Sequence, residues 1–217
     1  MYTPDTANAP GGAAGGAAGA ADAAWKQCRV TLPAPHNWLV LDLTAQQPDV
    51  WARSVADEHF TADVPADVPA AWREAFAQDV LWYWVAAARQ KSLCAALLTP
   101  QDSGVVAFYS VRELNVPPES LRLDVLRAEA ERAEGPYFVP QGVTEVELPL
   151  GAALRVHRLE PTDPDADSGS VLEGVAHYVL PRAHPTALEC RLLWGAVGLG
   201  EELGKIADEL AASLRLV

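Results

Sequence analysis

Basic side chains are scarce in this chain. Its 217 residues contain 16 Lys and Arg against 29 Asp and Glu, which gives a formal net charge of −13. Recognition of nucleic-acid phosphates needs a basic surface, so this balance argues against a nucleic-acid partner. It argues equally against adhesion to an anionic membrane surface.

Long apolar runs and targeting signals are also missing. No stretch reaches 18 consecutive apolar residues, so we expect no membrane span. No Lys or Arg precedes Lys26, whereas a secretory signal needs a basic start followed by an apolar segment. Residues 1–24 are mostly Ala and Gly and are predicted to form a flexible tail before a single domain at 25–217. These features predict a cytoplasmic protein.

Cysteine is too sparse for a disulfide framework or a zinc site. Cys28, Cys94 and Cys190 are widely spaced, each in an apolar context, and no CxxC motif is present. We therefore predict three buried, reduced thiols. Only three of the basic residues are Lys, a composition typical of high-GC bacterial genomes.

What is present is a clear alternation of short apolar runs and helical periodicities. Strands are predicted at 28–32, 38–43, 93–98, 105–111, 144–148, 153–159, 171–180 and 187–194, and helices at 48–60, 70–91, 117–133 and 200–214. Short turns join the strands at 93–111 and the last four strands, so both groups should be antiparallel.

Runs of neighbouring strands with interspersed helices indicate the α+β class. The sequence predicts one antiparallel sheet of about six strands that is covered by helices. No internal repeat is visible in the chain.

The helix at 70–91 carries an aromatic stripe. Trp72, Phe76, Val80, Tyr83 and Ala87 follow steps of three and four residues and are predicted to face the sheet. Trp82 and Trp84 flank that stripe, and Trp25 stands at the edge of the tail. These three tryptophans are candidates for a partner-binding surface, and the alternative is that they pack beneath the helices.

The glycine-rich segment from Gly195 to Gly204 lies between a strand and a helix, where a nucleotide loop belongs. Its GxGxxxG spacing is wrong for a dinucleotide loop, and Glu201 and Glu202 would repel a pyrophosphate. Ile206 follows Lys205 where a P-loop needs Ser or Thr. The segment is therefore predicted to be a strand-to-helix connector.

Histidines offer the other candidate chemistry. His157 and His177 lie in successive strands and could face each other, and with a nearby carboxylate they would form an enzyme or metal site. The alternative is that both are ordinary strand residues. There is no HExxH or GxSxG motif, and the acidic loop with Asp163, Asp165 and Asp167 lacks the Gly and Glu of a calcium-binding loop.

Two segments carry a resemblance. The sequence Leu32-Pro33-Ala34-Pro35-His36-Asn37-Trp38 and the helix at 200–214 resemble those of small actinobacterial proteins similar to the PsbP-like α/β/α sandwich group. That group includes a photosystem extrinsic subunit, a nuclear-import factor that binds a small GTPase, and bacterial envelope proteins. The resemblance implies an antiparallel sheet between helices and a binding or assembly role, and it transfers no functional residue. The missing signal peptide departs from the envelope members.

The sequence therefore predicts a non-enzymatic, cytoplasmic protein-binding module without cofactor or metal. Its partner should present a basic or apolar surface, and the fold-level analogy suggests a secretion or assembly system. The alternative is an enzyme or metal-binding protein built on His157, His177 and a carboxylate.

Overall fold

The structure is a computed structural model. It describes residues 22–24, 27–61, 68–100, 103–115, 117–132, 139–161, 171–182 and 184–217. Residues 1–21 of the tail predicted at 1–24 lie outside these ranges, as do the Asp163–Asp167 loop and Trp25. Asp22–Ala24, which the sequence places in the tail, forms strand β1.

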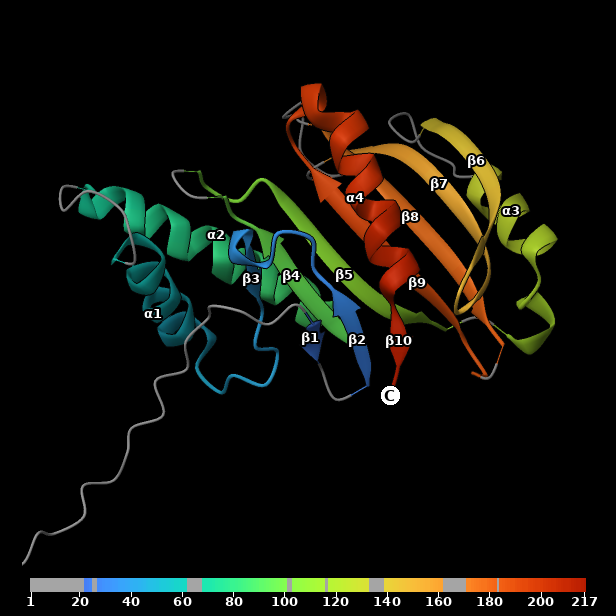
Figure 1. Cartoon of the computed structure of the whole chain (residues 1–217), viewed down its shortest axis with the longest axis horizontal. Helices are drawn as coiled ribbons and strands as arrows, with labels where there is room; N and C mark the ends of the chain where they lie inside the picture. The colour runs from blue at the N-terminus through green and yellow to red at the C-terminus, as the bar shows by residue number, and fades with distance from the viewer. Residues whose placement is uncertain are drawn as a thin grey trace, which may run out of the picture.

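A seven-stranded antiparallel sheet organises the molecule, in the order β3-β4-β5-β9-β8-β7-β6 (Figure 1). Its strands are β3 (Trp38–Val40), β4 (Cys94–Leu98), β5 (Ala107–Leu114), β6 (Val139–Leu148), β7 (Gly151–Pro161), β8 (Val171–Pro181) and β9 (Ala187–Trp194). The predicted β4–β5 hairpin and the antiparallel succession β6 to β9 are confirmed. β9 joins the two groups because it pairs with β5.

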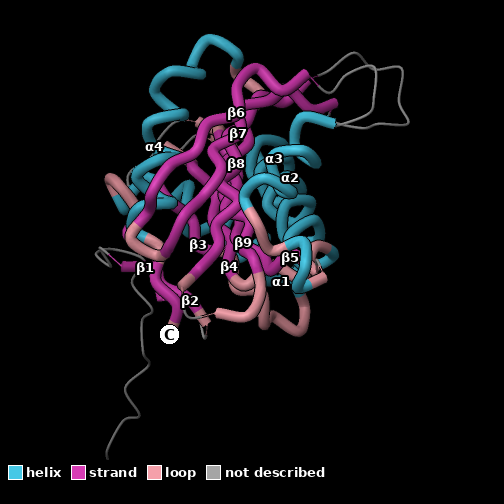
Figure 2. The backbone as a smooth tube through the Cα atoms, turned by 90° about the vertical axis from the view of Figure 1, so that its right-hand side faces the viewer, coloured by secondary structure: helices cyan, strands magenta, loops and turns pink. Residues whose placement is uncertain are grey.

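Helices cover both faces of the sheet, as Figure 2 shows in side view. α4 (Gly200–Ser213) packs on one face, here the α4 face. α1 (Pro48–Thr61), α2 (Ala70–Arg89) and α3 (Leu123–Arg132) lie on the other, the α2 face. The predicted α+β sandwich is therefore confirmed, with seven strands in the main sheet where about six were expected. None of the helices in the described ranges is both long and apolar enough to cross a membrane.

A small second sheet accompanies α4. β1 (Asp22–Ala24) and β10 (Arg215–Leu216) flank β2 (Cys28–Thr31), which the sequence did not distinguish from the main-sheet strands. Alternate residues of β2 are buried because they face the core beneath α4. The chain then turns through the 3-10 helix η1 (Pro35–Asn37), where the indole N–H of Trp38 donates to the Pro33 carbonyl at 2.8 Å. The Leu32–Trp38 motif thus closes a turn.

The α4 face has one continuous core. Leu203, Ala207, Leu210 and Leu214 bring the apolar stripe of α4 onto Cys190, Leu192 and other inward residues of the central strands. Burying each leucine side chain stabilises the fold by about 1.5–3 kcal/mol. Cys28, Cys94 and Cys190 meet in this core as free, buried cysteines, which confirms the sequence prediction.

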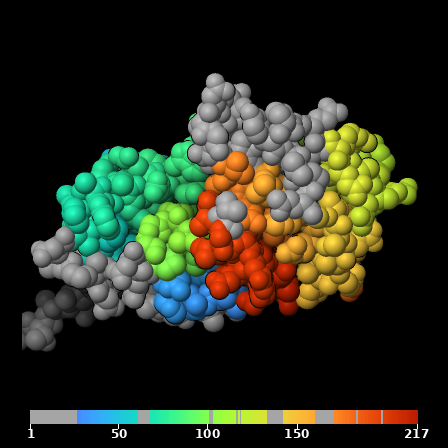
Figure 3. Space-filling model, turned by 90° about the horizontal axis from the view of Figure 1, so that it is seen from above, coloured from blue at the N-terminus to red at the C-terminus, as the bar shows by residue number. Residues whose placement is uncertain are grey.

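The α2 face has two separate cores. One lies under α1 and α2 and includes Phe76, Val80, Leu97 and Phe108, whereas the other lies under α3 and includes Leu126. Seen from above, the α1–α2 pair and α3 lie towards opposite ends of the molecule (Figure 3). Polar side chains separate the two cores on the central strands, as described below.

Candidate functional site

The outer face of α2 carries two exposed tryptophans. Phe76, Ala77, Val80 and Ala87 are the buried residues of this helix. Trp72 and Trp82 are 65% and 55% exposed, although the sequence assigned Trp72 to the buried stripe. This prediction was wrong because Trp72 lies in the first turn of α2, at the end of the helix that projects past the edge of the sheet (Figure 1).

The exposed tryptophans share a narrow strip with small residues. Trp72, Ala75, Asp79, Trp82 and Ala86 follow steps of three, four, three and four residues, which places them along one side of the helix. We call this set the tryptophan seam. Steps of three and four residues are also the spacing of the positions through which two helices pack in a coiled coil.

An apolar pocket opens beside the seam. The cavity of about 350 Å³ is lined by Phe60, Val68, Trp72, Ala75, Phe76, Asp79, Ser103 and Gly104. The ring of His59 stacks on Phe76 with centroids 4.6 Å apart, and burial lowers the pKa of His59. Burial also raises the pKa of Asp79, whose carboxylate lies in an otherwise largely apolar surface.

The other predicted partner-binding tryptophans differ from Trp82. Trp84 is partly buried, and its indole N–H donates to the Asp42 carbonyl at 2.7 Å, so it fastens α2 to the segment after β3. Trp25 lies outside the described residues. Sequence reasoning missed Trp72 as a candidate, because its exposure depends on where the sheet ends.

A polar cleft runs between α4 and the strands β7 and β8. The cavity of about 510 Å³ is lined by Arg155, His157, Glu173, Val175, Gly198, Gly200, Glu201, Gly204, Lys205 and Asp208. The His157 Nε2 atom lies 2.7 Å from Glu173 Oε1, and the indole N–H of Trp194 donates to Glu173 Oε2 at 3.1 Å. Glu173 is therefore a buried carboxylate with a partner on each oxygen.

The two candidate histidines lie on the same face of the sheet but bind different carboxylates. His177, only 2% exposed beneath α4, has Nε2 at 3.0 Å from Asp208 Oδ1, and the Arg155 Nε–H donates to the same oxygen at 2.7 Å. Burial raises the pKa of Asp208, but the hydrogen bonds from His177 and Arg155 outweigh it and hold that pKa below its ordinary value. Within the described ranges, no group of three His, Cys, Asp or Glu side chains is arranged to hold a metal ion.

The glycine connector allows α4 to approach these charged groups. A Cβ at Gly200 would lie 2.6 Å from Glu173 Oε1, and one at Gly204 would lie 3.4 Å from Arg155 Nη2. η3 (Val197–Leu199) leads directly into α4, as predicted for a strand-to-helix connector. The spacing that resembled a nucleotide loop therefore serves close packing between helix and sheet.

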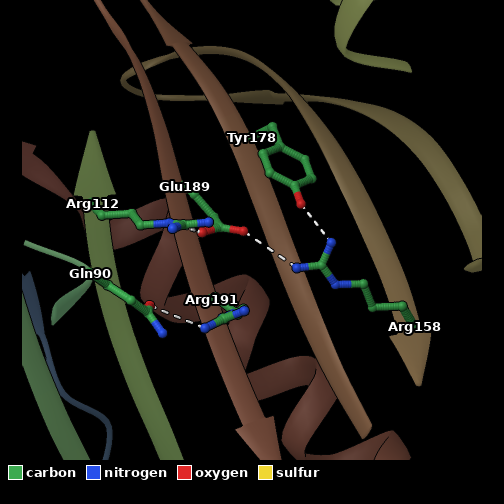
Figure 4. A network of polar contacts seen from close by, with 6 residues as sticks. All are labelled: Gln90, Arg112, Arg158, Tyr178, Glu189 and Arg191. Atoms are coloured by element: carbon green, nitrogen blue, oxygen red, sulfur yellow. Dashed lines mark hydrogen bonds and ion pairs between the residues drawn. The ribbon is translucent and has the colours of Figure 1, made fainter. Parts of the chain in front are cut away.

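A network of arginines lies on the opposite face, between the two cores (Figure 4). Arg112 and Arg158 both pair with the buried carboxylate of Glu189, Arg158 through Nη2 at 3.4 Å. The Arg158 Nη1–H donates to the Tyr178 hydroxyl at 2.7 Å, and Arg191 donates to the Gln90 side-chain oxygen at 3.2 Å.

The charges of this network shift two pKa values. Burial raises the pKa of Glu189, but Arg191, Arg112 and Arg158 outweigh that effect and lower it overall. Burial and the Glu189 charge raise the pKa of Tyr178 to about 12, so its hydroxyl stays protonated at neutral pH. Sequence reasoning did not single out this network because its members come from four strands and the end of α2.

Comparison with known proteins adds no relative. A scan against models of protein families and a search of curated proteins both found no match to the chain.

Proposed function

We propose that the chain is a non-enzymatic module that binds a helix of another protein on the tryptophan seam and its adjoining pocket. The proposal rests on the exposure of Trp72 and Trp82 on one side of α2. Large aromatic side chains supply most of the free energy at many interfaces, and clustered exposed aromatics mark interaction surfaces.

The spacing of the seam favours a helical partner. Ala75 stands between the larger Trp72 and Trp82, and Ala86 follows Trp82, so an approaching helix finds small side chains beside large ones. Helices bound in apolar grooves use anchors three and four residues apart. The 350 Å³ pocket beside Trp72 can receive one such apolar anchor.

Charge favours a basic amphipathic helix over a second copy of this chain. Asp79 is the middle residue of the seam, so two copies packed antiparallel through it would bring their Asp79 carboxylates together. Like charges at an interface are unfavourable, and the net charge of −13 adds to this repulsion. A Lys or Arg on a foreign helix would instead pair with Asp79.

The compartment proposed is the cytoplasm, because the three cysteines are free although Cys28 and Cys94 are neighbours in the core. A role in a secretion or assembly system follows from the analogy with the PsbP-like group alone. An enzyme using His157 and His177 together has less support, since His177 is sealed beneath α4 and each imidazole engages its own carboxylate.

Site-specific photo-cross-linking in the native host tests the proposal. A benzoylphenylalanine in place of Ala75 should give an adduct with another protein, and mass spectrometry should place it in an amphipathic segment containing Lys or Arg. The matched control is the same probe in place of exposed Ala128 on α3, at the far end of the molecule.

The adduct at position 75 should disappear in Trp72→Ala/Trp82→Ala, because each anchor is expected to contribute about 2 kcal/mol, roughly a 30-fold change in Kd. It should also disappear in Asp79→Lys, which reverses the central charge. Equal adducts at both positions, or adducts with this chain alone, would contradict the proposal.

A further inference from the structure

The cleft beside α4 contains hydrogen-bonding groups that the fold leaves unused. Arg155 donates through Nε to Asp208, and its two terminal nitrogens make no hydrogen bond to any residue that the structure describes. His157 engages Glu173 through Nε2, and its Nδ1 has no partner within the same ranges. Both side chains are about one quarter exposed, at 28% and 26%, so a small molecule can reach them.

The two groups lie side by side on one strand. Arg155 and His157 are two residues apart on β7, so both face the cleft and their Cα atoms are about 7 Å apart. Opposite them, Gly200 and Gly204 leave two positions of the α4 wall without side chains. The Arg155 Nη2 atom lies close to that wall, 3.4 Å from where a Cβ of residue 204 would be.

Each carboxylate of the cleft already has at least one partner in the fold. Asp208 accepts hydrogen bonds from Arg155 and is paired with His177, while Glu173 is bound by His157 and Trp194. Glu201 pairs with Lys205 at 2.8 Å on the outer rim. Arg155 keeps terminal N–H donors that no described residue uses, and guanidinium N–H donors bind a carboxylate or phosphate.

His157 adds a requirement for a hydroxyl group. The Nδ1 atom of His157 has no partner among the described residues, and a ligand hydroxyl suits it because a hydroxyl group can both donate and accept a hydrogen bond. An oxyanion on Arg155 and a hydroxyl on His157 would then occupy adjacent positions.

From this geometry we infer that the α4 cleft binds a small hydroxylated acid, with its carboxylate or phosphate on the Arg155 terminal nitrogens and a hydroxyl on His157 Nδ1. A volume of about 510 Å³ lies within the range of small-molecule sites. The cleft is separate from the tryptophan seam, so this inference does not depend on the proposed partner.

NMR titration of backbone amides in the intact chain at neutral pH and constant ionic strength tests the inference. Glycerate and glycerol 3-phosphate are the two probes, because they offer a hydroxyl beside a carboxylate or a phosphate. Saturable shifts at residues 155, 157, 200 and 204 with either probe are expected, and the tighter probe identifies the oxyanion. Glycerol, which lacks the anion, and propionate, which lacks the hydroxyl, should bind at least about tenfold more weakly.

Three variants separate the roles. Arg155→Gln should weaken both acids about tenfold or more, whereas Arg182→Gln, which alters an exposed arginine paired with Glu147, should change nothing. Gly204→Ala keeps every charge, favours the helix and places a methyl group beside the guanidinium, so it should weaken binding several-fold in a folded protein. His157→Phe should remove the preference for glycerate over propionate.

Absent or non-saturating shifts at the cleft with both acids would overturn the inference. Shifts that survive unchanged in Arg155→Gln and Gly204→Ala would overturn it as well, because the binding would then lie elsewhere. If the probe at position 75 gives no adduct while the acids still shift the amides of the cleft, only the proposed partner surface is contradicted.

Discussion

Glu189 is a residue whose surroundings are almost entirely cationic. It is buried on the α2 face, paired with Arg112 and Arg158 and influenced by Arg191. Buried ion pairs add little to stability when compared with apolar replacements, but removal of one partner leaves uncompensated charge. The network therefore acts chiefly as a constraint: the guanidinium group of Arg158 tolerates burial because this carboxylate is present.

Glu189→Gln should lower the free energy of unfolding by about 3–5 kcal/mol in urea titrations near pH 7. Glu147→Gln, which removes the carboxylate of an exposed pair with Arg182, should change it by less than about 1 kcal/mol. Equal effects of the two substitutions would show that the network adds nothing beyond an exposed ion pair.

The same residue gives the stability a defined pH dependence. The folded state lowers the pKa of Glu189, so its stabilising contribution is complete above the unfolded-state pKa of about 4.3 and is lost as the pH falls through the lower folded-state pKa. Urea titrations between pH 7 and pH 3 should therefore show a steeper loss for the wild type than for Glu189→Gln. Parallel curves would assign the acid sensitivity to other groups.

The three cysteines allow a second test at the residue scale. Burial, followed by the neighbouring Cys28, raises the pKa of Cys94 well above its ordinary value, and burial also raises the pKa of Cys190. Because the thiolate is the reactive form, a thiol reagent at pH 8 should leave the native protein unmodified while it labels three groups in urea. Rapid stoichiometric labelling without denaturant would contradict the buried cluster.

At the scale of the element, helix α4 depends on a glycine. A Cβ at Gly200 would lie 2.6 Å from Glu173 Oε1, and that carboxylate cannot swing away because His157 and Trp194 hold both of its oxygens. Gly200→Ala should therefore lower the free energy of unfolding by about 1–3 kcal/mol, although alanine favours helices. Gly198→Ala, with nothing within 4 Å of the new Cβ, is the matched control and should be close to neutral in the same denaturation experiment. A stabilised Gly200→Ala would mean that α4 does not sit this close to β8.

Elements were predictable from the sequence where the signal was local. The periodicity of α2 and α4 and the turns between β6 and β9 depend on neighbouring residues, and these predictions are confirmed. Strand β2 looked like a main-sheet strand, and Trp72 looked buried, because a residue's own periodicity does not say which element will cover it. The Arg155–Asp208–His177 contacts and the Glu189 network form only when β7, β8 and β9 pair in the right register. Their members are up to 77 residues apart in the chain, so local sequence patterns could not predict that they meet.

On the scale of the whole molecule, the distribution of basic residues sharpens the meaning of the −13 charge. Four of the 16 Lys and Arg residues, Arg112, Arg155, Arg158 and Arg191, lie on the two faces of the sheet within networks or the α4 cleft. Three carboxylates, Glu173, Glu189 and Asp208, lie in the same places, so the outer surface keeps nearly the whole negative charge. Such a surface resists self-association and attracts basic partners. We therefore expect the few exposed apolar patches to determine which partner binds.

The tryptophan seam combines exposed apolar side chains with a negative charge, and Asp79 supplies that charge. The wild-type chain should be monomeric at neutral pH, because a two-fold contact through the seam would oppose two Asp79 carboxylates. Asp79→Leu removes this repulsion and joins Trp72, Ala75 and Trp82 into one apolar strip, so it should dimerise at micromolar concentration in sedimentation or light-scattering experiments.

Trp82→Ala in the Asp79→Leu background should restore the monomer, whereas Val50→Ala, at an exposed apolar residue of α1, should leave the dimer intact. A monomeric Asp79→Leu would show that the seam lacks the area or shape for any helix, and would count against the proposed partner as well. A wild-type dimer that Trp82→Ala dissociates would instead make the second copy the occupant. The central carboxylate is therefore predicted to set which kind of helix this surface accepts.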